Sequence, residues 1–456
     1  MKPKQSLEWV KGFESKVDKI NYNVAGIDCW PIVRNTLLSM LLPKSSQTGK
    51  AAFPLIDILR SLRDLFFFKK ANVFILSDSK FSEEISGSLY LKDAHVICER
   101  EKSQAKTSII ALQNIAIDKS IVGREHCRSV FGVLLLAAAV AKLSPIMRYI
   151  PGLSRYIESL FAGLVTAPML HDGKVNCATL KKQVYRNILF CVVASKLFYF
   201  ILRQVKPENS YVVCYYSILG MALCAACRQL RIPVTDIQHG VAGRSMRAYA
   251  DWVKVPRRGY TTLPDTFFCW TKFDADAITE WAQHTDCHRA VVTGSLWRGY
   301  IEEQSLLLEA ENQWSGFFKE LNKFDKKVLI TMQSSTLTQL FVDVVKQCGA
   351  EYCFLIRKHP GFLLENDKNY IDLNCNYSNV FFEQPSGMPM QVLIRNVDIH
   401  LTEWSGAVID AYFENVNSVV TSEDALDYFE DYIAEGSVVF APLLNDVLHS
   451  LRYWRC

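Results

Sequence analysis

The chain has 456 residues, of which half are hydrophobic and 12% are aromatic, and this argues against a disordered protein. Its 51 basic and 47 acidic residues give a net charge of +4, which is too balanced to indicate nucleic-acid binding by charge alone. The 14 cysteines are scattered and several lie in apolar runs, so we expect buried, reduced thiols and no zinc site.

The first part of the chain mixes helices with a few strands. Residues 6–42 are expected to be helical around a break at 26–31. Two short apolar runs, at 71–79 and 94–100, are expected to form strands. Residues 105–205 are expected to be mainly helical.

An apolar stretch over residues 129–165 has two interpretations. Its uncharged part, 129–141, is too short to span a bilayer, which needs about 20 residues. The rest carries spaced arginines, Arg148 and Arg155, so the stretch is either a pair of core helices or lies on a membrane surface. The N-terminus lacks the apolar core of a signal peptide, so we expect a cytoplasmic protein, with the inner-membrane surface as a candidate partner.

A regular alternation of strands and helices begins near residue 205. The expected strands are 211–217, 233–239, 267–271 and 290–296, with helices at 218–230 and 274–284. Such alternation is typical of parallel βαβ units.

A second alternation follows a polar, partly helical bridge. Its expected strands are 328–333, 352–359, 379–384, 398–403 and 418–423, with helices at 337–348, 387–396, 406–415 and 424–434. The sequence therefore predicts an α/β protein with two Rossmann-like, doubly wound domains.

These alternations set the expected domain boundaries. The first domain takes residues 1–298, with a Rossmann-like core at about 205–298, added strands near 71–100 and a helical insertion at about 105–205. A linker at 299–326, a nucleotide-binding domain at 327–440 and a tail at 441–456 complete the chain.

Polar residues follow nearly every strand of the second alternation, where open α/β sheets bind ligands. The candidate ligand-binding residues at these strand ends are Ser334, Ser335, Arg357, His359, Glu383, Glu403, Ser405, Gly406 and Asp410. Arg357 and His359 lie two residues apart and so share one side of a strand, where they suit a phosphate. Ser405 is a candidate helix cap, and Gly406 would let a ligand approach the backbone. Each residue also has a plain structural interpretation as a cap or an exposed position.

In the first alternation, the strand at 233–239 ends in Gln238-His239-Gly240, and a basic loop follows with Arg244 and Arg247. Glycine allows a sharp exit from the strand, which would place the imidazole at the edge of the sheet. His239 is then a candidate base, a phosphate ligand or a simple strand cap.

Taken together, these motifs resemble a group of bacterial surface-polymer transferases. Gln-His-Gly in the first half and Arg-x-His-Pro in the second are similar to motifs of capsule and O-antigen glycosyltransferases, of CDP-glycerol glycerophosphotransferases, and of bacterial sialyl and Kdo transferases. Residues 22–37 and 249–271 also resemble segments of O-antigen cluster proteins.

The resemblance implies the GT-B fold, with two domains facing a cleft and the nucleotide on the C-terminal one. It implies that His239 is the base and that Arg357 and His359 hold the donor phosphates. Gln238, Gly240, Arg244 and Arg247 would then face the acceptor, a lipid-linked or growing glycan. The donor is a nucleotide-activated sugar, with a cytidine nucleotide slightly favoured.

Two further expectations concern the donor site. No Asp-x-Asp metal motif lies where GT-A enzymes need one, which agrees with a metal-independent enzyme that needs no cofactor. Where related transferases have a Ser-Ser pair, this chain has Trp404-Ser405-Gly406, which changes the contacts offered to the donor phosphate.

Alternatives remain open at this point. The chain could transfer glycerol phosphate from CDP-glycerol, or be a non-catalytic assembly or export protein with a degenerate GT-B fold. A nucleotide-sugar 2-epimerase also has two such halves, but no set of acid and base carboxylates can be assigned to it here.

Overall fold

The computed structural model of the chain describes residues 3–17, 20–41, 55–113, 117–142, 152–164, 176–359 and 367–453. The chain divides into two compact units. Unit 1 consists of Met1–Glu83 and Ser88–Trp297, and unit 2 of Glu84–Gly87 and Arg298–Cys456.

Unit 1 is built on a seven-stranded sheet in the order β11-β10-β9-β8-β3-β6-β7, and all its strands are parallel. The strands are β3 (Val73–Ser77), β6 (Ser108–Leu112), β7 (Cys127–Ser129), β8 (Asn209–Val213), β9 (Val234–Ile237), β10 (Thr266–Cys269) and β11 (Arg289–Val292). The expected alternation from residue 205 onward is confirmed.

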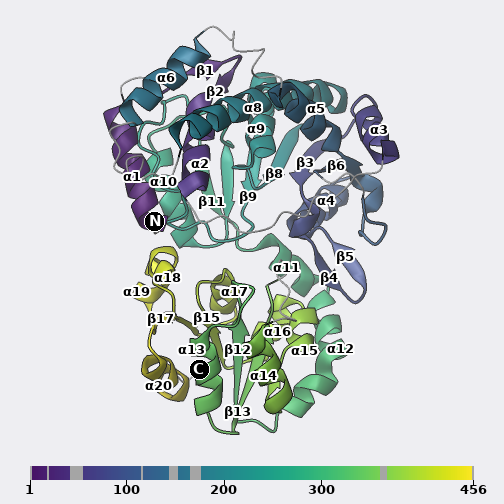
Figure 1. Ribbon diagram of the computed structural model, residues 1–456. Helices are drawn as coiled ribbons and strands as arrows, with labels where there is room; N and C mark the ends of the chain where they lie inside the picture. The colour runs from purple at the N-terminus through teal and green to yellow at the C-terminus, as the bar shows by residue number, and fades with distance from the viewer. Residues whose placement is uncertain are drawn as a thin grey trace. The chain divides into compact units, whose positions relative to one another are not determined.

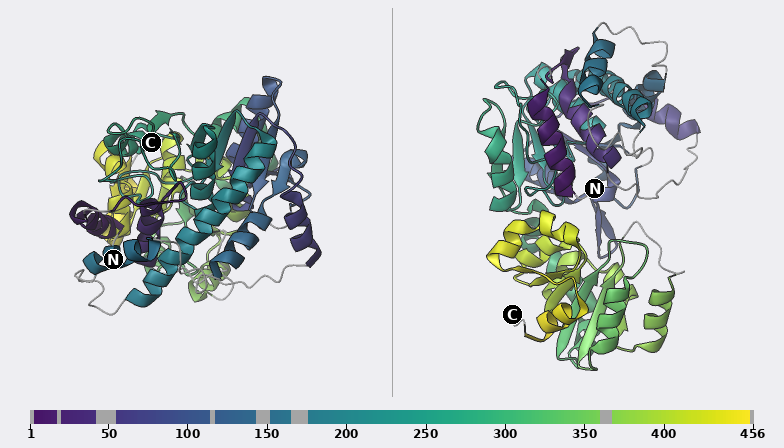
Figure 2. Two further views of the ribbon diagram at one scale, coloured as in Figure 1. Left: turned by 90° about the horizontal axis from the view of Figure 1, so that it is seen from above. Right: turned by 60° about the vertical axis from the view of Figure 1, so that its left-hand side comes forward.

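Helices and short elements complete unit 1. The helices are α1 (Pro3–Lys16), α2 (Cys29–Leu41), α3 (Leu55–Asp64), α4 (Lys92–Ser103), α5 (Phe131–Lys142), α6 (Leu153–Leu164), α8 (Cys177–Val205), α9 (Ile218–Leu230) and α10 (Lys272–Ala282). Two hairpins, β1–β2 (Asn23–Val24, Ile27–Asp28) and β4–β5 (Glu83–Ile85, Ser88–Tyr90), and two 3-10 turns, η1 (Ser79–Phe81) and η2 (Arg124–His126), join them. Residues Glu84–Gly87 of the second hairpin belong to unit 2. Figure 2 shows α1 and α2 as neighbouring purple helices.

One expectation for the first 205 residues was wrong. Residues 94–100 lie in α4, not in a strand, because the apolar run is followed by the helix formers Glu99, Arg100, Glu101 and Lys102. The described part of 105–205 is mainly helical, as expected, and it also contains the short strands β6 and β7.

The longest helix, α8, has 29 residues and packs between α5 and α9 (Figure 1). It is the one helix of the described chain long and apolar enough to cross a membrane by length and composition, and half of its most apolar window is buried inside the structure. That burial is typical of a core helix.

The apolar stretch at 129–165 forms α5 and α6, and its residues 143–151 and 165 lie outside the described chain. On α6 the residues that face the core recur every three or four positions, at Leu153, Tyr156, Ile157, Leu160 and Phe161. The structure therefore agrees with the interpretation of α6 as a core helix. Arg155 and Glu158 lie on its exposed face.

Unit 2 contains a six-stranded parallel sheet in the order β14-β13-β12-β15-β16-β17. The strands are β12 (Lys326–Thr331), β13 (Tyr352–Arg357), β14 (Val380–Phe381), β15 (Ile399–Thr402), β16 (Ser418–Val420) and β17 (Val438–Phe440). Crossover helices join them, so the α/β class with two parallel sheets is confirmed.

Except for α12, the described helices of unit 2 have at most ten residues. They are α11 (Leu296–Glu303), which begins in unit 1, α12 (Leu306–Leu321), α13 (Gln339–Gln347), α14 (Lys368–Asn376), α15 (Glu383–Gly387), α16 (Met390–Arg395), α17 (Ala407–Phe413), α18 (Glu423–Tyr428), α19 (Glu430–Glu435) and α20 (Leu444–Tyr453). The expected tail thus contains α20, whose Val447 and Leu451 belong to the core of this unit.

Candidate functional site

Three neighbouring strands of unit 1 bring their carboxyl ends together around His239. The imidazole follows β9, Tyr216 follows β8, and Phe81 follows β3 within η1. The strands are adjacent and parallel, so residues far apart in sequence meet at one edge of the sheet.

The imidazole of His239 is held between two aromatic rings. Its centroid lies 4.6 Å from the Phe81 ring and 5.7 Å from the Tyr216 ring, which stacks on it at 28°. The Tyr216 hydroxyl lies 3.2 Å from Nε2, a hydrogen bond in which either group can be the donor. Nδ1 is buried. One ring nitrogen therefore faces the protein interior and the other faces the Tyr216 hydroxyl.

Burial lowers the pKa of His239 to about 4, with the Ile237 carbonyl opposing the shift and the positive charges of Lys80 and Lys92 adding to it. The imidazole is therefore neutral at pH 7 and can accept a proton.

The turn that presents Tyr216 is tightly built. Cys214, directly after β8, has a left-handed backbone with φ of 70°. Ser217 caps α9 by accepting a hydrogen bond from Gly220 N at 3.0 Å. A Cβ at Gly220 would lie 2.5 Å from the Tyr215 carbonyl oxygen, so only glycine lets the helix approach this turn so closely.

A buried carboxyl group, Asp236, lies behind this turn. Its oxygens accept hydrogen bonds from Tyr215 N at 3.0 Å and from the Tyr249 hydroxyl at 2.9 Å. Burial raises the pKa of Asp236 to about 7, with both hydrogen bonds opposing the shift. Asp236 thus ties the loop after β9 to the turn that carries Tyr216, and no sequence motif marked it.

Gln238 and Gly240 do not have the geometry expected of them. Gln238 is 1% exposed. Its amide donates to the Gly240 carbonyl at 2.8 Å and accepts from Trp270 N at 2.6 Å, so it positions the strand end and does not face an acceptor. Gly240 is outside the left-handed region and a Cβ there would meet no atom within 4 Å, so the exit from β9 does not require glycine.

The basic loop after Gly240 is held by the N-terminal segment. Arg34 of α2 is buried and donates to the carbonyl oxygens of Arg247, Ala250 and Asp251 at 2.5, 2.9 and 3.0 Å. Its guanidinium lies 4.1 Å from the centre of the Trp252 ring. One buried cation therefore fixes the path of this loop.

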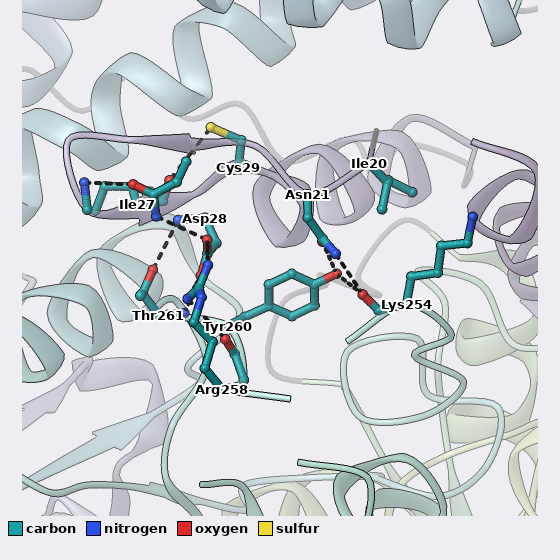
Figure 3. A network of polar contacts seen from close by, with 12 residues as sticks. Ile20, Asn21, Ile27, Asp28, Cys29, Lys254, Arg258, Tyr260 and Thr261 are labelled. Atoms are coloured by element: carbon teal, nitrogen blue, oxygen red, sulfur yellow. Dashed lines mark hydrogen bonds and ion pairs between the residues drawn. The ribbon is translucent and has the colours of Figure 1, made fainter. Parts of the chain in front are cut away.

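A second set of contacts, drawn in Figure 3, fastens the end of the same loop. Asp28 accepts two hydrogen bonds from Arg258, at 2.7 and 3.0 Å, and one from Thr261 N at 2.8 Å. The Tyr260 hydroxyl donates to Asn21 Oδ1 at 2.8 Å. Hydrogen bonds and an ion pair thus join the two segments that resemble O-antigen cluster proteins, 22–37 and 249–271.

The loop cations therefore have partners within unit 1. Arg244 pairs with Glu280, and Arg247 donates to the Leu38 carbonyl at 2.8 Å. These contacts support the loop, while the predicted role of Arg244 and Arg247 toward an acceptor stays a prediction.

In unit 2, Arg357 ends β13 and supports a neighbouring segment. Its guanidinium donates to the Pro385 carbonyl at 2.9 Å and to the Met388 carbonyl. His359, two residues on, is half-buried, and burial lowers its pKa. Arg357 is thus a positioning residue for α15, and His359 is the member of the pair that lies beyond the end of the strand.

Glu383 begins α15 instead of ending a strand. It is exposed and paired with Lys358 at 2.6 Å, and this pair lowers its pKa. Ser334 and Ser335 precede α13 by four residues or more, so neither caps it, and the Ser334 hydroxyl donates to the Thr336 carbonyl at 2.6 Å.

The turn after β15 carries the remaining predicted residues. Gly406, not Ser405, is the N-cap of α17, although the Ser405 hydroxyl accepts from Ala407 N at 3.2 Å. Burial raises the pKa of Glu403. Asp410 lies in the first turn of α17, a helix of only seven residues. Four predicted residues thus lie in this turn or in the first turn of the helix that follows it.

The comparisons do not identify a family. No protein-family model matches the sequence, and no curated protein matches it. Similar solved structures include the S. aureus MnaA–UDP co-structure (12% identity, TM-score 0.48, 84% of this chain and 87% of that one) and the UDP-GlcNAc 2-epimerase of Methanocaldococcus jannaschii (12%, 0.48, 84% and 94%). The wall teichoic acid polymerase TagF is another (12%, 0.44, 88% and 89%).

Two residues of the His239 site went unnoticed in the sequence. Phe81 lies in the run 77-SDSKF-81, which follows an apolar strand and contains no recognised motif. Tyr216 was counted as part of a buried strand. The signal that could have found them is the order of strands in the sheet, which places the ends of β3 and β8 beside β9. Among the described residues, no group of three histidine, cysteine or acidic side chains is arranged to hold a metal ion.

Proposed function

We propose that the chain is a GT-B glycosyltransferase that moves a sugar from a nucleotide-activated donor to a lipid-linked or growing surface glycan, such as O-antigen or capsule. The observation that carries the proposal is a neutral imidazole, His239, at the carboxyl edge of a parallel sheet beside Phe81 and Tyr216. Transfer to a hydroxyl group needs a base for the acceptor proton, and aromatic rings suit the apolar face of a sugar.

In this proposal His239 takes the acceptor proton and Tyr216 holds the imidazole in place. A pKa of about 4 keeps His239 neutral but makes it a weak base. An anionic donor that approaches the ring would raise this pKa, because a negative charge favours the protonated imidazole. His239 would therefore be a stronger base when the donor is bound.

Unit 2 would hold the donor. His359, Glu403 and Ser405 lie at or just after the ends of β13 and β15, the edge where open α/β sheets bind ligands. Arg357 and Glu383 would hold the surrounding segments in place and not bind the donor themselves, because their charged groups already contact Pro385 and Lys358. We propose that the reaction needs no metal ion or other cofactor, and a cytidine-linked donor is the first to test.

The experiment compares two variants of one site. His239→Ala should leave nucleotide affinity close to that of the unaltered protein and lower turnover about 10²–10⁴-fold. Tyr216→Phe keeps the stacked ring and removes only the hydroxyl, so its turnover should fall less. Turnover of His239→Ala within threefold of the unaltered enzyme would contradict the assignment of the base.

Product analysis separates this function from its rivals. A CMP-linked sugar and CDP-glycerol both release CMP, so the acceptor product decides between them: sugar transfer leaves a glycosidic bond without phosphorus, whereas glycerophosphate transfer leaves a phosphodiester. A thermal-shift screen of nucleotides tests the non-catalytic alternative, since a ligand at 100 times its Kd adds about 2.7 kcal/mol of stability. If no nucleotide stabilises the protein, the transferase proposal fails.

A further inference from the structure

Unit 1 exposes large aromatic side chains directly after α3. Phe66 and Phe67 are 62% and 71% exposed. Phe200, on α8, is 45% exposed, and its ring meets that of Phe66 edge-on at 5.8 Å. Segments 134 residues apart therefore form one apolar patch, which we call the Phe66 patch and define as Phe66, Phe67 and Phe200.

The Phe66 patch is held firmly by the residues on either side of it. Leu65 and Phe68 are buried in the core of unit 1. The Gln204 side chain of α8 donates to the Leu65 carbonyl at 3.1 Å, and the Phe68 ring contacts the Phe74 ring of β3. The two phenylalanines between these anchors are therefore presented to solvent by an ordered backbone, at a cost of apolar surface left in water.

Basic side chains lie close to the patch in the sequence or line a hollow with Phe67. These basic residues, which we call the basic fringe, are Arg63, Lys69, Lys70, Arg128 and Arg203. The acidic residues of the same segments are Asp64 and Glu125. Lys69 and Lys70 follow Phe68 directly, and Arg203 lies one turn after Phe200. Phe67, Arg63 and Arg128 line one hollow, in which Asp64 pairs with Arg63 at 2.8 Å. Arg128 donates to the carbonyl oxygens of Glu125 and Cys127 from one nitrogen.

Exposed aromatic rings with a basic fringe match the surface of an anionic lipid bilayer. Rings enter the boundary between head groups and acyl chains, and lysine and arginine side chains contact the lipid phosphates. A second copy of this chain fits the patch less well, because a two-fold contact would place its basic fringe against itself. We propose that the Phe66 patch and its fringe are the surface by which this protein docks on a bilayer that contains anionic phospholipid.

This inference deepens the proposed location at the inner membrane, but it can be tested without the reaction. The patch precedes the start of β3, whereas Phe81 follows its end, so the patch and the His239 site lie at opposite ends of that strand. Substitutions in the patch should therefore leave turnover with a water-soluble acceptor unchanged.

The test is co-sedimentation of the full chain with vesicles of phosphatidylcholine alone or with 30% phosphatidylglycerol, without donor or acceptor. We expect binding to the anionic vesicles that falls at high salt. The double variant Phe66→Ser/Phe67→Ser should bind at least tenfold more weakly. Lys69→Gln/Lys70→Gln should lower the affinity by about 20–30-fold, from the usual contribution of a basic side chain near such a surface.

The matched control is Leu443→Ser in unit 2, which removes a side chain that is 66% exposed but lies outside the Phe66 patch. It should bind like the unaltered chain. The proposal is overturned if the unaltered chain does not bind anionic vesicles, or if the double phenylalanine variant binds them as tightly as the control does. It also fails if that variant changes the oligomeric state in light scattering while vesicle binding stays the same, which would assign the patch to a second copy.

Discussion

Replacing Arg34 by methionine should strongly destabilise unit 1, although position 34 lies far from the loop it supports in the sequence. The guanidinium makes three hydrogen bonds to backbone carbonyls between residues 247 and 251. It also lies 3.9 Å from the buried Glu14 carboxylate, whose other oxygen accepts a hydrogen bond from the Trp30 indole at 2.9 Å. Methionine fills a similar volume but provides none of these donors.

The expected cost follows from those contacts. Each carbonyl left without a donor in the interior costs about 1–3 kcal/mol, and removal of one partner from a buried ion pair costs about 3–5 kcal/mol. These contributions overlap, so we expect a loss of at least about 4 kcal/mol in the free energy of unfolding. That is a large share of the stability of an ordinary domain.

The loss should also depend on pH. Burial raises the pKa of Glu14, and Arg34 opposes this shift. Without Arg34 the pKa of Glu14 should rise further, so the folded variant would bind a proton that the unfolded chain releases. The destabilisation by Arg34→Met should therefore be smaller at pH 5 than at pH 8, and Glu14→Gln in the same chain should remove the difference.

Urea unfolding followed by tryptophan fluorescence measures the effect, because Trp30 and Trp252 contact the two charged groups. The matched control is Arg257→Met in the same loop. Arg257 is 85% exposed and pairs with Asp286 at the surface, so its loss should cost about 1 kcal/mol or less. If Arg34→Met unfolds at the same urea concentration as Arg257→Met, the assigned role of the buried guanidinium is wrong.

Three further predictions concern titration and the donor. Because the folded pKa of Asp236 is raised to about 7, its contribution to stability should fall by roughly 3 kcal/mol as the pH rises from 4 to 7, and Asp236→Asn should flatten this slope in urea titrations. The acidic limb of the kcat/KM profile, which reports the free enzyme, should lie below the pH of about 6.5 that an ordinary imidazole gives, and a limb near 6.5 would contradict the lowered pKa of His239. In the donor-saturated kcat profile this limb should lie at a higher pH, because the anionic donor raises the same pKa. His359→Ala should weaken nucleotide binding at least about tenfold in calorimetry without lowering the melting temperature, and unchanged affinity would remove His359 from the donor site.

The parallel sheets could be predicted from the sequence because each buried strand is a short apolar run that ends in polar residues. This also located His239, since 233–239 is such a run. The orientation of Gln238 could have been read in the same way. Strand residues alternate between faces, so Gln238 shares a side with the buried Asp236, and His239 lies on the other.

Other features depend on contacts that no local pattern reveals. The run 94–98 is apolar enough for either a strand or a helix, and only the charged helix formers after it decide for α4. The burial of Arg34 could not be predicted, because arginine is normally exposed and its partners lie more than 200 residues away. Arg357 was expected at a phosphate for the same reason that it binds two carbonyls, namely its planar set of donors.

The contact between Arg34 and the loop at 247–251 has a consequence for the order of events during synthesis. The arginine and the first carbonyl it binds are 213 residues apart. At about 5–20 residues per second, a ribosome needs roughly 10–45 seconds to make the residues between them. During that interval α2 has emerged, but its guanidinium and the Glu14 carboxylate have no loop to enclose them. The N-terminal segment therefore cannot reach its folded arrangement during this interval. Unit 1 can complete its folding only after most of its chain has left the ribosome.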